Sequence, residues 1–357
     1  MLDTDTDTTP AERRGLADRL PRGRLGSVGR AENFWIGMIL LLLIVVFTII
    51  APPHTFLTWS NATNVLLDAS ELLILASGMT FLLISAGLDL SIGSVVVFCA
   101  VISAKAFAGL SGSAAQAAAG HYPHLALAVA VGVVAGILSG TAWGLFNGFV
   151  VVVMKVPPFI ATLGTAGIAL GAAQVISNGI NVVGVPLPLE ERFGLGKVFG
   201  VVPWPVVIAV LVVAVAWVTL VRTRFGMRTM AIGANIEAAR RAGIRTGLHI
   251  GALYAAMGTL AGLVSIIDVS RFGTASIGGH TQDVLSAIAA VVIGGTSLFG
   301  GRGSISGTVI GVFIPAVLIN GFVIVGVEPF WQNIAVGLIL IGAVYADQLR
   351  RRRAIRA

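Results

Sequence analysis

Charge is the scarcest property of this 357-residue chain. Only 11% of its residues are charged and 56% are hydrophobic, whereas typical soluble domains carry about 25% charged residues. A soluble core cannot absorb that much apolar surface, so lipid must solvate much of the chain. The composition excludes an ordinary soluble domain and predicts an all-α integral membrane protein.

Residues for chemistry are also missing. The chain has one cysteine, Cys99, which excludes an internal disulfide and is best interpreted as a buried bystander thiol. No G-x-x-x-x-G-K-[ST] loop is present, and the glycine cluster GGTSLFGGRGSISG at 294–307 lacks the lysine that reaches nucleotide phosphates. No metal-ligand spacing or nucleophile–base pair can be read. We expect no enzyme, and no cofactor or metal bound by this chain.

Apolar segments fill most of the sequence. A helix needs roughly 20 apolar residues to cross about 30 Å of hydrocarbon. We expect about ten such helices, at 33–51, 65–86, 91–109, 125–154, 158–177, 204–221, 248–268, 284–299, 304–325 and 329–346. The many glycines, 45 in all, suit helices that pack closely in a bilayer.

Basic residues predict the orientation. Ten spans place 19 of the 23 lysines and arginines on one side, and only Lys105, Arg192, Lys197 and Arg271 on the other. By the positive-inside rule, both termini and the loop 222–247 are cytoplasmic. The basic balance is thus an orientation signal, and nucleic acid is not needed to explain it. We divide the chain into a disordered cytoplasmic tail (1–30), a membrane domain (31–349) and a basic cytoplasmic tail (350–357).

Polar residues inside or beside the spans are candidates for the translocation pathway, because ionisable groups are costly in a membrane. Each also has a structural interpretation. The first two could face a polar cavity or the interface, and the amides that precede glycine fit helix contact better than substrate binding. The candidates are Asp68, Glu71, Asp89, Ser91, Asn147, Gln174 and Asn320.

Asp89 lies in GLDLSIG, where one apolar run gives way to the next. It could line the pathway at a broken helix, or Asp89 or Ser91 could accept a backbone N–H at the start of the third helix. Capping is the favoured interpretation. Farther along the chain, Asp268 precedes Arg271 by three residues, and a local ion pair between them is expected.

The segment GANIEAARRAGI at 233–244 is unusually polar for this chain. Asn235 suits an N-cap, Glu237 the first turn of a helix and Gly243 its C-terminal stop. Glu237 and Arg241 have the favourable i, i+4 spacing. A small face on these two turns is formed by Ala238, Ala239 and Ala242. Such a helix is too short to be stable alone, and it is either a docking element for a partner or a solvated connector.

This segment resembles the EAA-type cytoplasmic segment of bacterial ABC-importer permeases, and is most similar to the ribose-type branch. Further similar stretches follow in order: GMTFLLISAGLDLSIGSVV (78–96), FIATLGTAGIALGAAQVISNG (159–179), LSAIAAVVIGGTSLFGGRGSISGTVIG (285–311) and LINGFVIVGV (318–327). The resemblance implies an ATPase-coupling role for Asn235, Glu237, Ala238, Ala239, Arg240, Arg241 and Gly243. This chain is one residue longer before its Glu-Ala-Ala than the family pattern, which turns Glu237 by about 100°.

The resemblance also implies partners. They are cytoplasmic ABC ATPase subunits that bind ATP and magnesium, a periplasmic or lipid-anchored solute-binding protein, and a second permease copy, identical or paired. The expected function is ATP-driven import of a small polar solute, most simply a monosaccharide, across the bacterial inner membrane. The alternative is an ion-coupled secondary transporter, with Asp89 as its leading coupling residue.

Overall fold

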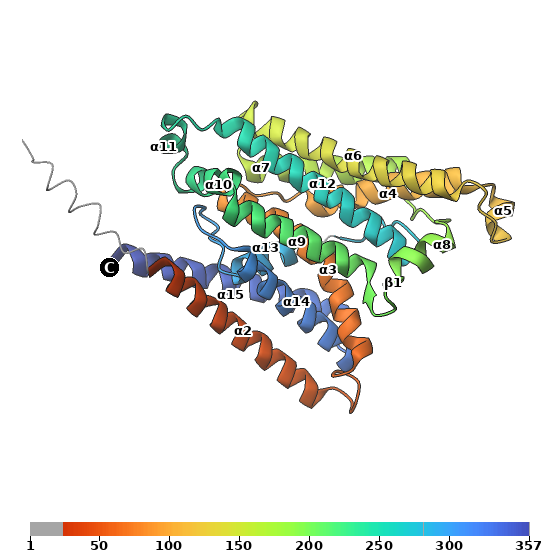
Figure 1. Ribbon diagram of the computed structural model, residues 1–357, viewed down its shortest axis with the longest axis horizontal. Coiled ribbons are helices and arrows are strands. Elements are labelled where there is room, and N and C mark those ends of the chain that lie inside the picture. Colours follow the sequence, from red (N-terminus) through yellow and green to blue (C-terminus); the bar gives the residue numbers. More distant parts are fainter. Residues whose placement is uncertain (1–23, 281, 357) are drawn as a thin grey trace, which may run out of the picture.

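The computed structural model describes residues 24–280 and 282–356, and helices make up nearly all of its regular structure (Figure 1). A short antiparallel hairpin, β1–β2, is the one sheet in this part of the chain. The helices are α2 (Arg24–Ile50), α3 (Trp59–Ile84), α4 (Ile92–Ser111), α5 (Ala114–Ala118), α6 (Leu125–Val152), α7 (Pro158–Ser177), α8 (Leu187–Leu189), the π-helical turn η1 (Glu190–Gly194), α9 (Trp204–Arg222), α10 (Arg224–Ala234), α11 (Ile236–Arg241), α12 (Thr246–Phe272), α13 (Asp283–Ile293), α14 (Ile305–Val325) and α15 (Pro329–Arg356). The strands are β1 (Lys197–Val198) and β2 (Val202–Pro203).

Seven described helices are long and apolar enough to cross a membrane, namely α3, α4, α6, α7, α9, α12 and α14. Three shorter apolar helical stretches, Phe34–Ile50, Asp283–Ile293 and Pro329–Gly342, coincide with the remaining predicted spans. The protein is therefore an all-α membrane protein, as the composition predicts.

The predicted span at 284–299 is wrong as a continuous helix. The helix α13 has 11 residues and is only about 16 Å long, roughly half of the hydrocarbon thickness. It ends because Gly294 caps it and Gly295 has φ 85°, a left-handed conformation that suits glycine. α13 is thus a half-helix, followed by a glycine-rich turn that leads into α14.

The ends of the molecule differ in charge. Figure 1 shows α10 and α11 at one end, together with the start of α2 and the end of α15. The arginine-rich parts of the described chain therefore share one end, whereas α5, α8 and β1 lie at the other. The predicted tail at 1–30 lies mostly outside the described residues, and α2 begins within it. The basic segment 350–356 continues α15 as helix.

Helices α6 and α12 pack through glycine. Every fourth residue of α6 from Gly132 to Gly148 is buried. A methyl group added to Gly140 would lie 2.2 Å from the carbonyl oxygen of Gly258, and one added to Gly144 would lie 2.2 Å from that of Tyr254. The two backbones therefore touch, as small-residue helix pairs do in membranes. Helix α4 packs beside this pair.

Candidate functional site

The helix α11 is capped at both ends by its own sequence. The side-chain Oδ1 of Asn235 accepts the backbone N–H of Ala238 at 3.0 Å, as expected for its N-cap. At the other end Gly243 has φ 82°, its N–H bonds to the Arg240 carbonyl, and the Ile244 N–H bonds to the Ala239 carbonyl. These two bonds form a Schellman motif. Local hydrogen bonds thus define this helix of six residues.

The surface of α11 faces solvent. Of its residues only Ala239 is buried, so the predicted small face is reduced to one contact, and Ala238 and Ala242 are exposed. The expected pair of Glu237 with Arg241 is replaced by an i, i+3 pair of Glu237 with Arg240 at 3.1 Å, both side chains being 61% exposed. Six residues make fewer than two turns, so the i, i+3 geometry is as accessible as i, i+4. α11 therefore presents a charged, unburied surface.

The preceding helix α10 fastens α11 to the membrane bundle. Thr223 caps its first turn by accepting the N–H groups of Phe225 and Gly226. The Phe225 ring packs against His249 of α12 with centroids 4.2 Å apart and the rings tilted by 37°, and Thr229 bonds to His249 Nε2 at 2.8 Å. A charged surface helix is thus tied to a buried junction between α10 and α12.

Three pathway candidates meet at the start of α4. Asp89 is 2% exposed, and its Oδ1 accepts both the N–H and the hydroxyl of Ser91, at 2.8 and 2.6 Å. Asn147 of α6 donates to the Ser91 hydroxyl at 2.8 Å and to Asp89 at 3.4 Å. Asp89 thus binds the N–H of Ser91, the residue before the first helical residue Ile92, and neither side chain accepts an N–H from within α4 as the capping interpretation expected. This cluster joins the segment before α4 to α6.

The other two amides lie apart from this cluster. Asn320 of α14 exchanges two hydrogen bonds with Asn61 of α3, at 3.0 and 2.9 Å. This reciprocal amide pair satisfies both side chains and holds two helices together, as expected for helix contact. Gln174 is exposed on the surface of α7.

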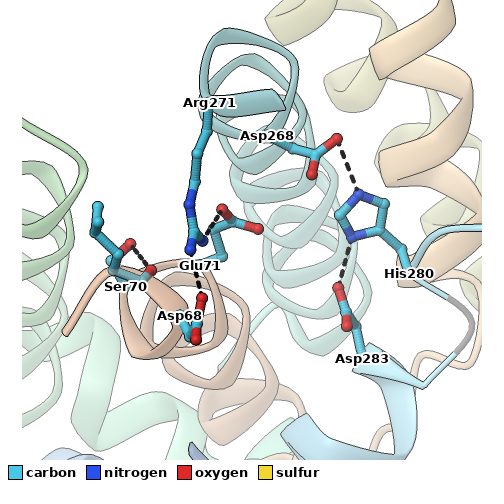
Figure 2. A network of polar contacts seen from close by, with 8 residues as sticks. Asp68, Ser70, Glu71, Asp268, Arg271, His280 and Asp283 are labelled. Atoms are coloured by element: carbon cyan, nitrogen blue, oxygen red, sulfur yellow. Dashed lines mark hydrogen bonds and ion pairs between the residues drawn. The ribbon is translucent and has the colours of Figure 1, made fainter. Parts of the chain in front are cut away.

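The remaining candidates, Asp68 and Glu71, lie in a charged network (Figure 2). This network lines a cavity of about 560 Å³. Arg271 of α12 reaches across to both carboxylates of α3, and its distance to Glu71 is 3.3 Å. The expected pair of Asp268 with Arg271 is therefore wrong. Instead, His280 Nε2 pairs with the Asp268 carboxylate at 3.3 Å, and His280 Nδ1 pairs with the Asp283 carboxylate at 2.7 Å.

This arrangement fixes the charge of His280. Each ring nitrogen faces a carboxylate, which accepts but cannot donate a hydrogen bond, so both nitrogens carry a proton. Burial by itself lowers the pKa of His280, but the bonds to Asp268 and Asp283 outweigh it and raise the pKa to about 10. His280 is thus a cation between two anions at neutral pH.

The cavity offers acceptors to a ligand. In the ion pairs between described residues, each of the four carboxylates uses one oxygen. Asn181, Phe272 and Ile319 line other parts of the wall. Glu71, Asp268 and His280 also bring possible metal-ligating atoms within 4.8 Å of one another. The unused carboxylate oxygens are acceptors for a solute rich in hydrogen-bond donors.

Sequence reasoning found two of the six ionisable residues in this network. It missed the roles of His280 and Asp283, and it assigned Asp268 and Arg271 to each other. These residues could have been found by their rarity, because few ionisable residues lie within or beside the predicted spans. The pairing itself depends on the contact of α3 with α12, which no local pattern predicts.

Comparison with known proteins agrees with this architecture. The family described as "Branched-chain amino acid transport system / permease component" matches residues 61–344. The D-allose transport system permease of Escherichia coli is 32% identical over 311 residues, 87% of this chain and 90% of the relative. The ribose import permease of Bacillus subtilis is 35% identical over 310 residues, with the same coverage.

A third relative, the galactose/methyl galactoside import permease of E. coli, is 33% identical over 332 residues, 89% of this chain and 95% of the relative. No solved structure is significantly similar to the chain. With matches that cover most of both sequences, this helical membrane protein belongs to the transport-system permease family.

Proposed function

We propose that the chain is the membrane subunit of a bacterial ABC importer that carries a monosaccharide, driven by ATP hydrolysis in partner subunits. The relatives named for ribose, D-allose and galactose support a sugar as the solute. The same class of importer requires an ATPase pair, a solute-binding protein outside and a second permease copy. The ion-coupled alternative has no support from the family, and Asp89 is engaged by Ser91 and Asn147.

The observation that carries this proposal is the presentation of α11. A helix of six residues is not stable in isolation, yet α11 is capped at both ends, charged and almost wholly exposed. A mere connector needs none of these features. They suit a helix that docks into a groove on a soluble partner, and we assign that partner as the ATPase.

The proposed orientation follows from charge. The end that carries α11, the start of α2 and the end of α15 holds the arginine-rich segments, and we place it in the cytoplasm. All ten apolar segments then contribute to the membrane domain, with α13 as a half-helix that enters from the external side.

We place the external entrance for the sugar at the cavity beside Asp68 and Glu71. Carboxylates accept hydrogen bonds from the hydroxyl groups of a sugar. Phe272, with the Arg271 guanidinium 4.9 Å from its ring centroid, contributes apolar surface to the wall. The cluster of Asp89, Ser91 and Asn147 and the Asn61–Asn320 pair have structural roles in this scheme.

Co-purification with the candidate ATPase tests the docking role. The double charge swap Glu237→Lys/Arg240→Glu keeps an i, i+3 ion pair within α11 but reverses the charges that a partner meets. We expect wild type to retain the ATPase and the swapped protein, folded and inserted, to lose it. The matched control is the swap Glu191→Lys/Arg192→Glu in η1 at the opposite end, which should retain it. Equal retention by all three proteins would contradict docking at α11.

A further inference from the structure

Gly233, at the end of α10, lies directly on a hydrogen bond between two other parts of the chain. The Gly301 N–H donates to the carbonyl oxygen of Ile84 at 2.8 Å. A methyl group on Gly233 would lie 1.7 Å from that oxygen and 2.6 Å from the Gly301 nitrogen. No side chain fits there, so the backbone of α10 lies in direct contact with the Gly301–Ile84 hydrogen bond, which joins the last turn of α3 to the turn after α13.

Two further glycines complete the contact. Gly300 and Gly301 have φ 83° and 77°, conformations that glycine adopts at low cost. A methyl group on Gly300 would lie 2.8 Å from the Gly233 carbonyl oxygen, and one on Gly301 would lie 3.1 Å from the Ala234 Cα. We call the meeting of residues 84–86, 233–234 and 300–301 the three-turn junction. Its members touch through backbone, which leaves no flexible side chain to absorb a displacement.

The three segments lead to different parts of the molecule. Asn235, the N-cap of α11, follows Ala234 directly. Residues 85–91 lead from the junction to Asp89 and the start of α4. Residues 300–301 belong to the turn that joins the half-helix α13 to α14, and Figure 1 shows this turn beside α10.

A push on α11 has few routes into the bundle. Within α11 only Ala239 is buried, and a cavity of about 630 Å³ separates Ile236 and Arg240 from Val152 and Lys155 of the neighbouring α6–α7 turn. Apart from the contact at Ala239, force from α11 passes along the backbone at its two ends. The end toward α10 leads at once to the three-turn junction.

We propose that Gly233 is a positioning residue for energy coupling, and that the three-turn junction moves as one body, carrying displacement of α11 to the break before α4 and to the break between α13 and α14. The proposal rests on the proposed function, in which an ATPase acts on α11. Its new content is the route and the residue that maintains it.

The test is Gly233→Ala in the full transporter with its ATPase and binding protein. We expect the variant to insert, to retain the ATPase and to hydrolyse ATP at the basal rate. Uptake, and the stimulation of hydrolysis by loaded binding protein, should both fall by about tenfold or more, a usual size for coupling between sites. Gly109→Ala is the matched control, since it is also a helical glycine and a methyl group there meets nothing within 4 Å. It should behave as wild type.

The outcomes separate the two proposals. Normal uptake by Gly233→Ala would overturn the coupling role, and so would joint loss of ATPase retention and uptake, which indicates a docking or folding defect. If wild type itself never retains an ATPase, the proposed function fails and this inference fails with it.

A cross-link provides a second readout, in which the reduced form of the same variant controls for the strain that a side chain at Gly301, with φ 77°, introduces. A methyl group on Gly301 would lie 3.3 Å from the Ala234 Cβ, near the Cβ separation of about 3.8 Å in disulfides. In a Cys99→Ala background, oxidised Ala234→Cys/Gly301→Cys should keep its uptake, because the joined segments move together. Loss of uptake on oxidation that a reductant restores would show that the segments slide, and would overturn the proposal.

Discussion

At the scale of single residues, His280 joins two carboxylates of the charged network, those of Asp268 and Asp283. Two carboxylates hold the imidazole as a cation, and Glu71 and Arg271 complete the charges around it. Ionisable groups buried in a membrane protein are expensive and tend to mark function. These ion pairs lie in the wall of a cavity and leave its interior open, which is compatible with the solute entrance proposed above.

The stability that His280 provides should depend on pH. Its pKa is raised to about 10 in the folded protein, against about 6.5 for a free imidazole. The stabilisation is therefore complete below about pH 6.5 and is lost as the pH rises through about 10. Between these values the unfolded chain binds one proton fewer than the folded protein, so the free energy of unfolding falls as the pH rises.

Thermal unfolding of purified wild type and His280→Gln measures this effect. Glutamine can donate a hydrogen bond but carries no charge. The difference in Tm should be largest near pH 6 and should shrink steadily toward about pH 10. A difference that stays constant across this range would mean that His280 is neutral in the folded protein.

At the scale of elements, the close packing of α6 on α12 makes a stringent demand on side-chain size. A methyl group on Gly140 already meets the Gly258 carbonyl at 2.2 Å. Gly140→Leu should therefore separate the helices and destabilise the fold by about 3 kcal/mol or more, beyond ordinary overpacking because the obstacle is backbone.

The measurement is the yield of monodisperse protein and its Tm in detergent. Gly109→Leu is the control, since nothing lies within 4 Å of a methyl group there, and it should lose little. Equal losses from the two substitutions would argue that leucine at either position acts on insertion and not on this helix contact.

The capping of α11 makes a second prediction at this scale. Asn235→Ala removes the side chain that accepts the Ala238 N–H, and loss of an N-cap costs about 1 kcal/mol. For so short a helix this is a large share of its stability. We expect ATPase affinity to fall about fivefold, which corresponds to that free energy.

Asn235→Asp supplies the rescue, because aspartate is an equally good N-cap. Titration of the ATPase against the reconstituted permease should show near wild-type affinity for this variant. If alanine and aspartate weaken binding alike, Asn235 contacts the ATPase directly and its capping role is secondary.

At the scale of the whole molecule, the common end of the arginine-rich segments predicts sidedness. In a Cys99→Ala background, a cysteine at Arg241 should be protected from an impermeant maleimide added outside intact cells. A cysteine at Lys197 in the β1–β2 hairpin should react. As a control, both cysteines should react with the maleimide in a mixture of inside-out and right-side-out vesicles, where both sides of the membrane are accessible. Labelling of the Arg241 position from outside would reverse the orientation proposed here.

Most of the architecture could be predicted from the sequence because it follows from local chemistry. Apolar runs at 65–86, 125–154 and 304–325 are close to α3, α6 and α14, since solvation by lipid depends on the composition of the segment itself. The caps of α11 at Asn235 and Gly243 were equally readable. The prediction of one helix over 284–299 was wrong because Leu298 and Phe299 add apolar residues beyond Gly294, where the helix ends.

By itself, the sequence determined that this is a helical membrane protein of the permease family, where the short charged helix α11 lies and how that helix is capped. These properties depend on residues close together in the chain. Only the tertiary structure decided that Arg271 pairs with Asp68 and Glu71, that His280 lies between Asp268 and Asp283, and that Gly233 seals the bond from Gly301 to Ile84. The partners in these contacts belong to elements far apart in sequence, and helix packing alone brings them within bonding distance.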